Sequence, residues 1–457
     1  MSAKSVAPKS AQSFPVVTFE RFMLAGDSYA FPMSFVFELE LVGTLDRQRL
    51  SRAMTRCMGL HPILFSRLSD DGKRWVYSPP RSVKAQLVVD EEDYRSALRF
   101  DLDSEIGLRC LIRESSPGHW KIGFAIHHAC TDGLGAFQFI QDVSVAYRND
   151  VDVETASPNP DESIEYLRRH RNSYGNHRFW HWLRWPIDLV GMVWTLEMFM
   201  NRPGAIVPCS ADGFSKARTS HSNQKHGENA PARDFDSLRF KLTQEETTHA
   251  KRLAKLAGQS LNDRILESVF LAIQDWYEAF NPDQSNSLIR LMVPMNLRKS
   301  STASAANMVA MVNFDRKIGR WRSKKWLRKL LIWEMKAVKR MRAGVTANRF
   351  LQLQYFLLGK WPMQARHDRC FATGLVSNLG ELSRTLERDA KGATCFGTLA
   401  VEGFHCVAPL RHHSNVFFAV FTYLDQLHFS LTFNAGILEP THVESLMEKV
   451  RSHLLHE

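Results

Sequence analysis

Apolar residues alternate with polar ones along two segments of the first half of the chain, which is the pattern of half-buried strands. Both segments, 34–43 and 120–128, are followed by apolar residues at the spacing of an amphipathic helix. The alternating positions are Phe35, Phe37, Leu39 and Leu41 in the first segment and Ile122, Phe124 and Ile126 in the second. The helical positions are Leu50, Ala53, Met54 and Cys57 after the first and Leu134, Phe137 and Ile140 after the second. Shorter strand-like runs lie at 63–68, 75–78, 83–89 and 108–114.

The second half repeats this mixture of strands and helices. Capping-box patterns predict helix starts at Thr243, with Glu246 three residues on, and at Ser260, with Asp263. Strands are expected at 288–298, 372–380, 416–424 and 427–436, and helices at 350–361 and 440–455. The fold class is therefore expected to be α/β (of the α+β type), with two similar subdomains that each contain a mixed sheet flanked by helices.

A polar stretch rich in Pro, Gly, Ser and Asn separates the halves at residues 203–236. We expect a flexible linker there, between an N-terminal subdomain at 1–202 and a C-terminal subdomain at 237–457. Just before the linker, residues 179–200 are apolar and rich in Trp. Charged residues and a proline interrupt this run, so a buried or interface-lying helix pair is expected in preference to a transmembrane span.

Charge and cysteine content limit the partners and the cellular compartment that we expect for the protein. The net charge is +11, but residues 316–345 hold twelve of the 59 Lys/Arg and only one acidic residue. The remainder, 47 basic and 47 acidic residues, is balanced, so no nucleic-acid partner is expected. Seven cysteines without a C-x-x-C pair argue against a disulfide scaffold. The N-terminal residues lack an apolar signal core, and a cytoplasmic protein, with peripheral membrane contact as an alternative, is expected.

The run HHACTDG at residues 127–133 carries the candidate chemistry. It joins a predicted buried strand to a predicted helix. If the strand continues, His128 projects from the same apolar row as Ile126, where desolvation keeps an imidazole neutral. A neutral imidazole can accept a proton from an alcohol, amine or thiol near neutral pH. Asp132 can cap the following helix or pair with a distant arginine, and Gly133 permits a turn.

This HHxxxDG motif resembles the signature of the chloramphenicol acetyltransferase-like superfamily, which includes condensation domains, alcohol acyltransferases and wax ester synthases. Four further segments resemble that superfamily in the same order along the chain. They are LVGTLDRQRLSRAMTRCMGLHPILFSRL, SLNDRILESVFLAI, VPMNLR and VSNLGEL. The resemblance implies two similar subdomains with a tunnel between them, which admits donor and acceptor from opposite sides. The D-F-G-W-G stretch of the plant acyl-CoA enzymes is missing.

The resemblance also implies site residues. His128 would be the general base, and Asp132 would pair with an arginine of the second half, for which Arg298 is the candidate. His127 would be a packing residue and Gly133 a backbone requirement. Ser377 and Asn378 are candidates for stabilising the oxyanion, with a turn at the end of a strand as the alternative interpretation.

The implied activity is transfer of an acyl group from a thioester donor, either acyl-CoA or an acyl carrier protein in trans, to an alcohol or amine. A stand-alone condensation-type enzyme is the first alternative, and a non-catalytic descendant of the fold that binds membranes or nucleic acid is the second. No metal or redox cofactor is expected. His405, His412 and His413 lie near one another, but they lack Cys or Glu partners at ligand spacing.

The basic segment predicts an amphipathic helix, with lysines and arginines opposite an apolar stripe that begins at Leu327. Three interpretations remain open at this point. The helix could pack on its own domain with a solvated cationic face. Residues 320–342 could instead lie on a membrane surface, or they could recognise an anionic donor such as coenzyme A or an acidic carrier protein.

Overall fold

The computed structural model describes most of the two predicted subdomains but few residues of the segment that joins them. The described residues are 12–29, 31–149, 159–171, 186, 235–280, 288–298, 304–317, 323–341, 343–359, 372–384, 386–390, 392–411, 416–435 and 438–456. Of the Trp-rich segment at 179–200, only residue 186 is in this set. Of the predicted linker at 203–236, only residues 235 and 236 are in it.

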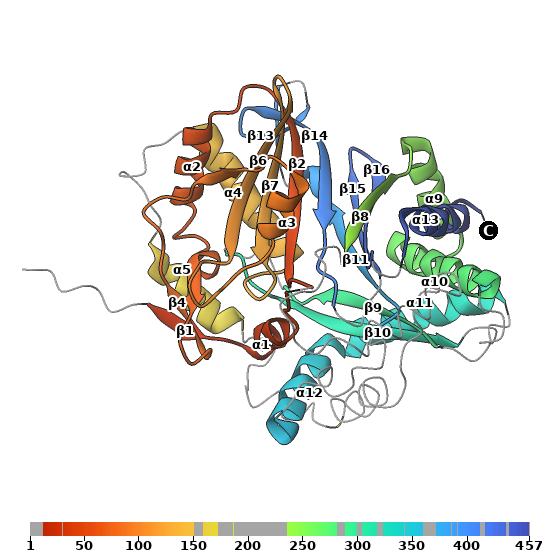
Figure 1. Cartoon of the computed structure of the whole chain (residues 1–457). Coiled ribbons are helices and arrows are strands. Elements are labelled where there is room, and N and C mark those ends of the chain that lie inside the picture. The colour runs from red at the N-terminus through yellow and green to blue at the C-terminus, as the bar shows by residue number, and fades with distance from the viewer. Residues whose placement is uncertain are drawn as a thin grey trace, which may run out of the picture.

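The first half is built on a seven-stranded sheet, in which the long strands are antiparallel neighbours (Figure 1). The order is β12-β13-β14-β2-β7-β6-β5. The strands are β2 (Ser34–Val42), β5 (Ala85–Leu87), β6 (Leu108–Ser116), β7 (His119–His127), β12 (Glu387–Arg388), β13 (Thr394–Phe396) and β14 (Leu399–Val407). Helices α2 (Arg47–Arg56) and α4 (Gly133–Asn149) pack on one face of this sheet.

Smaller elements complete the first half. A three-stranded sheet has the order β1-β4-β3, from β1 (Ser13–Pro15), β3 (Ser66–Leu68) and β4 (Arg74–Tyr77). The short helices are α1 (Thr18–Ala25), α3 (Glu91–Ser96) and α5 (Pro160–His170). The strand expected at 63–68 is wrong in its first part, because Pro62–Phe65 form a 3₁₀ turn and only Ser66–Leu68 pair as a strand. Proline favours such a turn at its first positions.

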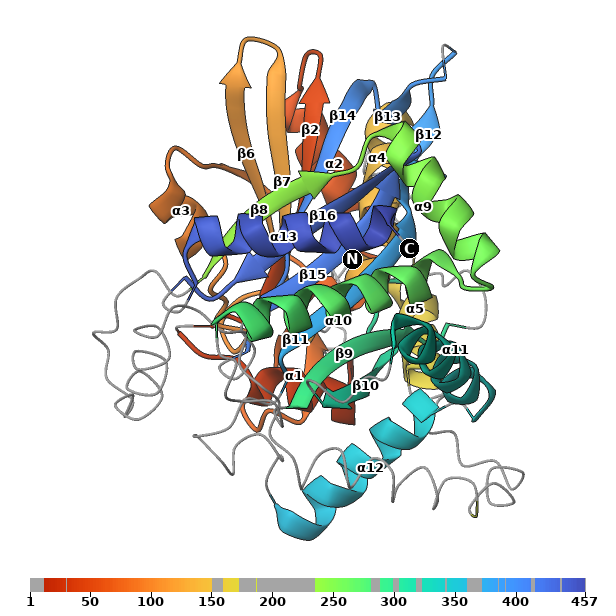
Figure 2. The same ribbon diagram turned by 90° about the vertical axis from the view of Figure 1, so that its right-hand side faces the viewer.

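The second half contains a six-stranded mixed sheet of order β10-β9-β11-β15-β16-β8, which helices cover on its outer side (Figure 2). Its strands are β8 (Asp236–Lys241), β9 (Leu288–Asn296), β10 (Val309–Lys317), β11 (Gly374–Glu381), β15 (Val416–Tyr423) and β16 (Gln426–Phe433). The helices are α9 (Gln244–Leu256), α10 (Leu261–Phe280), α11 (Lys324–Met341), α12 (Ala343–Leu358) and α13 (Pro440–Leu455). Two mixed sheets flanked by helices confirm the predicted fold class.

Three strands from the second half of the chain belong to the sheet of the first half, which the predicted subdomain boundary at residues 203–236 did not anticipate. They are β12, β13 and β14. β14 pairs with β2 from Ala400 opposite Val42 to Val407 opposite Val36. The two halves are therefore not separate along the sequence, because residues 387–407 complete the first sheet.

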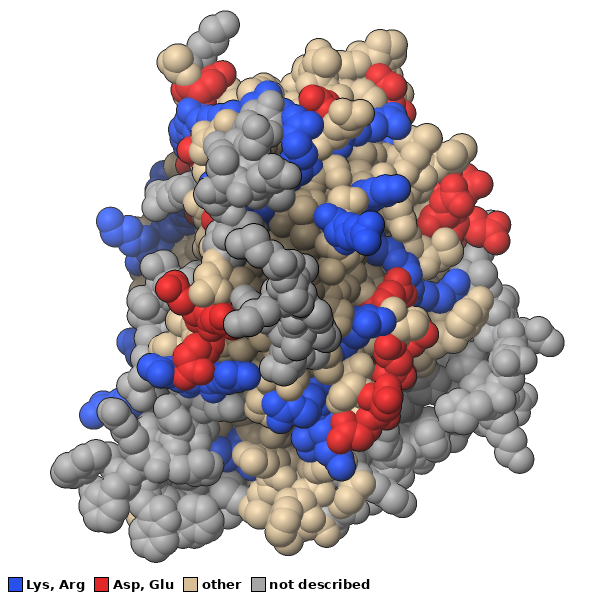
Figure 3. Space-filling model, turned by 90° about the vertical axis from the view of Figure 1, so that its left-hand side faces the viewer, with Lys and Arg blue, Asp and Glu red and all other residues tan. Residues whose placement is uncertain are grey.

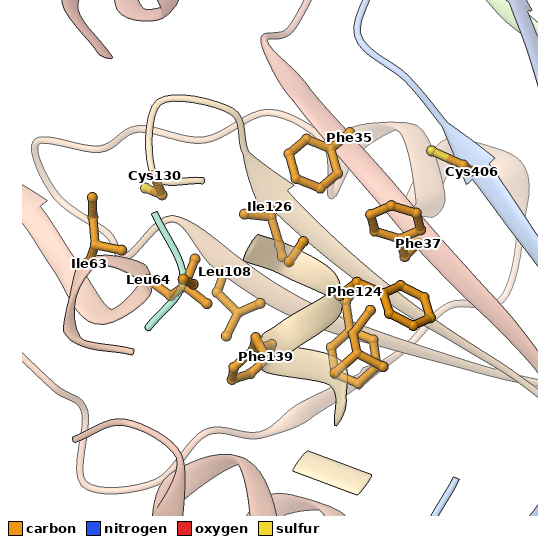
Figure 4. Packing of buried hydrophobic residues seen from close by; sticks show 14 of the residues in the cluster. Phe35, Phe37, Ile63, Leu64, Leu108, Phe124, Ile126, Cys130, Phe139 and Cys406 are labelled. Atoms are coloured by element: carbon orange, nitrogen blue, oxygen red, sulfur yellow. The ribbon is translucent and has the colours of Figure 1, made fainter. Parts of the chain in front are cut away.

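Buried side chains form a core that crosses between the halves. Phe35, Phe37, Phe124 and Ile126 pack with Phe139 of α4 on one side of the first sheet (Figure 4). The same cluster contains alternate residues of β15, namely Phe417, Ala419, Phe421 and Tyr423. The intervening residues of β15, Val416, Phe418 and Val420, belong to a second cluster under α10 and α13. The second sheet is thus buried on both faces, one of them toward the first half.

Candidate active site

The HHxxxDG motif lies where β7 ends and α4 begins, as its sequence context predicts. β7 ends at His127, but the backbone N–H of His128 still donates to the carbonyl of Met33, at 2.7 Å. This bond continues the β2–β7 ladder by one residue. The His128 ring therefore lies on the side of Phe35, whose ring it meets edge to face at 5.2 Å between centroids.

The environment of His128 favours its neutral form. Nδ1 is buried without a hydrogen-bond partner among the described residues. The residue as a whole is partly exposed. Burial lowers the pKa of His128 to about 4; Asp132 opposes this shift, while the positive charge of Arg411 adds to it. An imidazole with this pKa is unprotonated at neutral pH and can accept a proton.

A residue from the second half fixes the backbone at His128. The side-chain amide of Asn307 donates to the carbonyl oxygens of His128 and Ala129, at 2.8 and 2.9 Å. Asn307 is fully buried in the segment that leads into β10. This contact could not be predicted from the sequence, because a single Asn before an apolar run is an ordinary feature. Arg411, which is also buried near His128, was missed for the same reason.

Asp132 and Arg298 form the predicted pair across the two halves. The guanidinium donates to both carboxylate oxygens, at 2.7 and 2.9 Å, and both side chains are almost fully buried. Asp132 also accepts the backbone N–H groups of Met308, at 2.7 Å, and Gly135, at 3.0 Å. Because four donors occupy this carboxylate, it has little remaining capacity to take part in proton transfer. Its contacts instead join the start of α4 to the strands of the second half.

Two glycines of the motif region are required by packing. A Cβ at Gly133 would lie 2.9 Å from Cδ2 of Leu379, on β11. Gly133 has no positive φ, so the obstacle to a side chain at this turn is close contact with β11. Gly135 was missed: its Cβ would lie 3.0 Å from backbone atoms of Ala306 and closer still to Thr131. The N-terminal turn of α4 thus packs directly on the second half.

His127 points away from His128. It is 1% exposed, its Nδ1 accepts the N–H of Ala129 at 3.1 Å, and its ring meets that of Phe100 edge to face. Its Nε2 lies 3.5 Å from a carboxylate oxygen of Asp27. These contacts are those of a packing residue that shapes the turn.

The two oxyanion candidates lie on opposite faces of β11. Ser377 alternates with Leu375 and Leu379, which pack in the core shared by the halves, whereas Asn378 alternates with Val376 of the outer cluster. The Asn378 side chain is exposed and accepts the N–H of Gly380, at 2.9 Å. No hydrogen bond joins either described residue to His128. Of the two, only Ser377 faces the half that carries the motif.

A polar cleft of about 650 Å³ lies on the opposite face of the first sheet from His128. Glu38, Lys121, Arg239 and His405 are among the side chains that line it. His405 bridges two serine hydroxyls, at 3.1 and 3.2 Å from those of Ser430 and Ser237. His412 and His413 lie outside the described residues, within which no group of three metal-ligand side chains occurs. Separately, each of the five cysteines in the described part of the chain is buried and free.

Comparisons with known proteins agree with this architecture. No protein-family model matches the chain. A stretch of 149 residues is 30% identical to the probable non-canonical nonribosomal peptide synthetase CymA of Salinispora arenicola (strain CNS-205), and it spans 30% of this chain but 2% of CymA.

Several solved structures superpose on nearly the whole chain. The nonribosomal peptide synthetase FmoA3 matches with a TM-score of 0.65 and 16% identity, over 100% of this chain and 44% of FmoA3. The X-domain from teicoplanin biosynthesis gives a TM-score of 0.63, at 14% identity over 98% of this chain and 96% of the X-domain. The condensation domain of the monacolin K polyketide synthase MokA gives 0.62, at 11% identity over 97% of each chain.

These matches define the fold. The chain has the two-sheet fold of condensation domains, which belong to the chloramphenicol acetyltransferase-like superfamily. The fold implied by the resemblance of the HHxxxDG motif is therefore confirmed.

Proposed function

We propose that the protein is an acyltransferase that moves an acyl group from a thioester to an amine or hydroxyl group, with His128 as the general base. The observation that carries this proposal is the state of His128. Burial keeps its imidazole neutral, and a buried asparagine from the other half holds its backbone carbonyl at the junction of the two halves. The motif also lies between the end of the buried strand β7 and the start of α4, which supports the proposal.

The proposed reaction uses one proton and one imidazole. The acceptor's nucleophilic atom attacks the thioester carbonyl while His128 takes its proton. The carbon–sulfur bond then breaks, and the imidazolium returns the proton to the leaving thiolate. The products are an ester or amide and a free thiol, so no redox or metal cofactor is consumed. Ser377 is our candidate donor to the oxyanion, from β11.

A carrier-bound donor is the preferred form of the substrate. Two of the solved structures named above come from a nonribosomal peptide synthetase and a polyketide synthase. A pantetheine arm on a carrier and the same arm in coenzyme A present the same thioester to the site residues. The donor therefore needs a direct test.

The donor test measures thiol release from matched acyl groups presented in two ways. Acyl-coenzyme A and the same acyl group on a phosphopantetheinylated carrier protein are supplied with mixed alcohol and amine acceptors. We expect acceptor-dependent release at least tenfold faster from the carrier. Equal or faster release from coenzyme A would identify a free-thioester acyltransferase. Release from neither donor, with folded protein, would favour a non-catalytic binding protein.

The pH dependence of transfer should reflect the low pKa of His128. Because burial lowers this pKa to about 4, the base form is fully populated at neutral pH. We expect kcat/KM to be insensitive to His128 ionisation near neutral pH and to fall only as the pH decreases through about 4. A solvent-exposed histidine would instead give a midpoint near about 6.5. Circular dichroism at each pH separates loss of the base from acid unfolding, and a midpoint near 6.5 would contradict the buried-base assignment.

A further inference from the structure

The outer face of α11 alternates aromatic and cationic side chains along its length. Trp326, Lys329, Trp333, Lys336 and Arg340 recur at intervals of three and four residues, so they form one stripe. All five are exposed. The opposite stripe, Leu327, Leu331, Met335 and Val338, is buried in the second core, so the helix is already anchored and its outer stripe faces solvent.

The cations of this stripe have no acidic partners among the described residues. The helix contains one acidic residue, Glu334, and Arg316 of β10 engages it. Arg328 is likewise engaged by Glu267 of α10. Lys329, Lys336 and Arg340 make no ion pair within the described part of the chain. This leaves a concentrated positive field on one helix of a protein that is otherwise charge-balanced.

Large apolar side chains continue onto the next helix. Phe356 and Leu357, near the end of α12, are 83% and 67% exposed. Seven of the twelve exposed large apolar side chains among the described residues lie on α11 and α12, so they are concentrated rather than scattered. The two helices contact one another, and Figure 2 shows α12 at the lower edge of the molecule with α11 above it at the right. We define the α11–α12 patch as the five stripe residues of α11 together with Phe356 and Leu357 of α12.

A different face of the molecule offers a contrast. There, Lys and Arg are interspersed with Asp and Glu, and acidic side chains form groups of their own (Figure 3). Soluble domains commonly carry positive and negative side chains interspersed over their surface. The α11–α12 patch combines unpaired cations with exposed aromatic rings, and this combination needs a separate explanation.

We propose that the α11–α12 patch binds the surface of an anionic lipid bilayer. Lysines and arginine would meet the headgroup phosphates, while the tryptophans lie at the interface and Phe356 and Leu357 insert into its apolar edge. An acidic protein partner would account for the cations of the patch. It would not account for the two exposed apolar side chains at the end of α12. Within the described residues no helix is long and apolar enough to cross a membrane, so the contact would be peripheral.

The first experiment is co-sedimentation with vesicles of phosphatidylcholine alone and of phosphatidylcholine mixed with phosphatidylglycerol. The protein should bind the anionic vesicles at least tenfold more tightly, and this binding should weaken as salt increases. Lys329→Glu/Lys336→Glu/Arg340→Glu should weaken binding at least tenfold, because each basic residue near an anionic surface contributes a several-fold change in affinity. Phe356→Ser/Leu357→Ser should weaken vesicle binding by a smaller factor, and this factor should be the same at low and high salt.

A matched control lies on α9, where Lys251, Lys255 and Leu256 are also exposed. Lys251→Glu/Lys255→Glu/Leu256→Ser changes a similar amount of surface and should leave vesicle binding unchanged. Equal binding to both vesicle types, or an equal loss in this control, would overturn the proposal. Binding to an acidic acyl carrier protein through the α11 cations, without vesicle binding, would also overturn it and define a protein-docking surface. All variants are checked by circular dichroism.

The outcome is independent of the acyl-transfer proposal. Thiol release measured without vesicles should be the same in the patch variants as in the wild-type protein, because none of the seven residues contacts the motif. A failure of vesicle binding would therefore leave the transfer activity untouched.

Discussion

Replacing His128 by alanine should lower the rate of acyl transfer by roughly 10²–10⁴-fold, the contribution expected of a positioned general base. Without the imidazole, the acceptor must lose its proton to water. The structure predicts that this variant folds, because the bonds from Asn307 and to Met33 involve backbone atoms of His128, which alanine retains. Thiol release from the preferred donor, with and without acceptor, measures the effect.

His119→Ala is the matched control. His119 lies at the other end of β7, with an exposed side chain, and its loss should leave the rate within twofold of wild type, as surface substitutions usually do. If His128→Ala retained half of the wild-type rate, His128 would not be the base, and another group would have to accept the proton of the acceptor.

Replacing Asp132 by alanine should destabilise the protein by about 3–5 kcal/mol, the usual cost of leaving a buried charge without its partner. Arg298 would lose both of its carboxylate bonds, and the N–H groups of Met308 and Gly135 would lose their acceptor. Transfer activity should fall as well, because the start of α4 and the strands of the second half would separate around His128. Urea unfolding at neutral pH measures the change in stability.

Two further variants isolate the buried charge as the cause. In Asp132→Ala/Arg298→Met the orphaned guanidinium is removed, and part of the lost stability should return. Glu165→Ala breaks an exposed pair with Arg169 on α5 and should cost at most about 0.5 kcal/mol. A loss below about 1 kcal/mol in Asp132→Ala would show that the pair has no structural role.

Local sequence patterns predicted strands and helices correctly where one face of the strand or helix is buried. β2 and β7 follow their alternating phenylalanines and isoleucines, and α13 spans Pro440–Leu455 as expected. The Thr243 cap is present, with its hydroxyl accepting the N–H of Glu246. Side-chain alternation and capping act within a few residues, so they can be identified from a single sequence.

Contacts between distant segments were predictable only through the family resemblance. The Asp132–Arg298 pair was inferred in this way, since no local pattern relates residues 166 positions apart. Asn307, Arg411 and Gly135 escaped notice because each is a common residue in an unremarkable setting. The pKa of His128 likewise depends on burial by both halves, which alternation along one strand indicates only in part.

The strand exchange described above has a consequence for how the chain is made. As synthesis proceeds from the N-terminus, β2 emerges early with one hydrogen-bonding edge open, and its partner β14 ends only at residue 407. An open edge of this length is a template for pairing with other chains. The nascent first sheet must therefore remain incomplete, with this edge of β2 unpaired, until residue 407 has been translated. Production of either half alone would leave β2 or β14 without its neighbour.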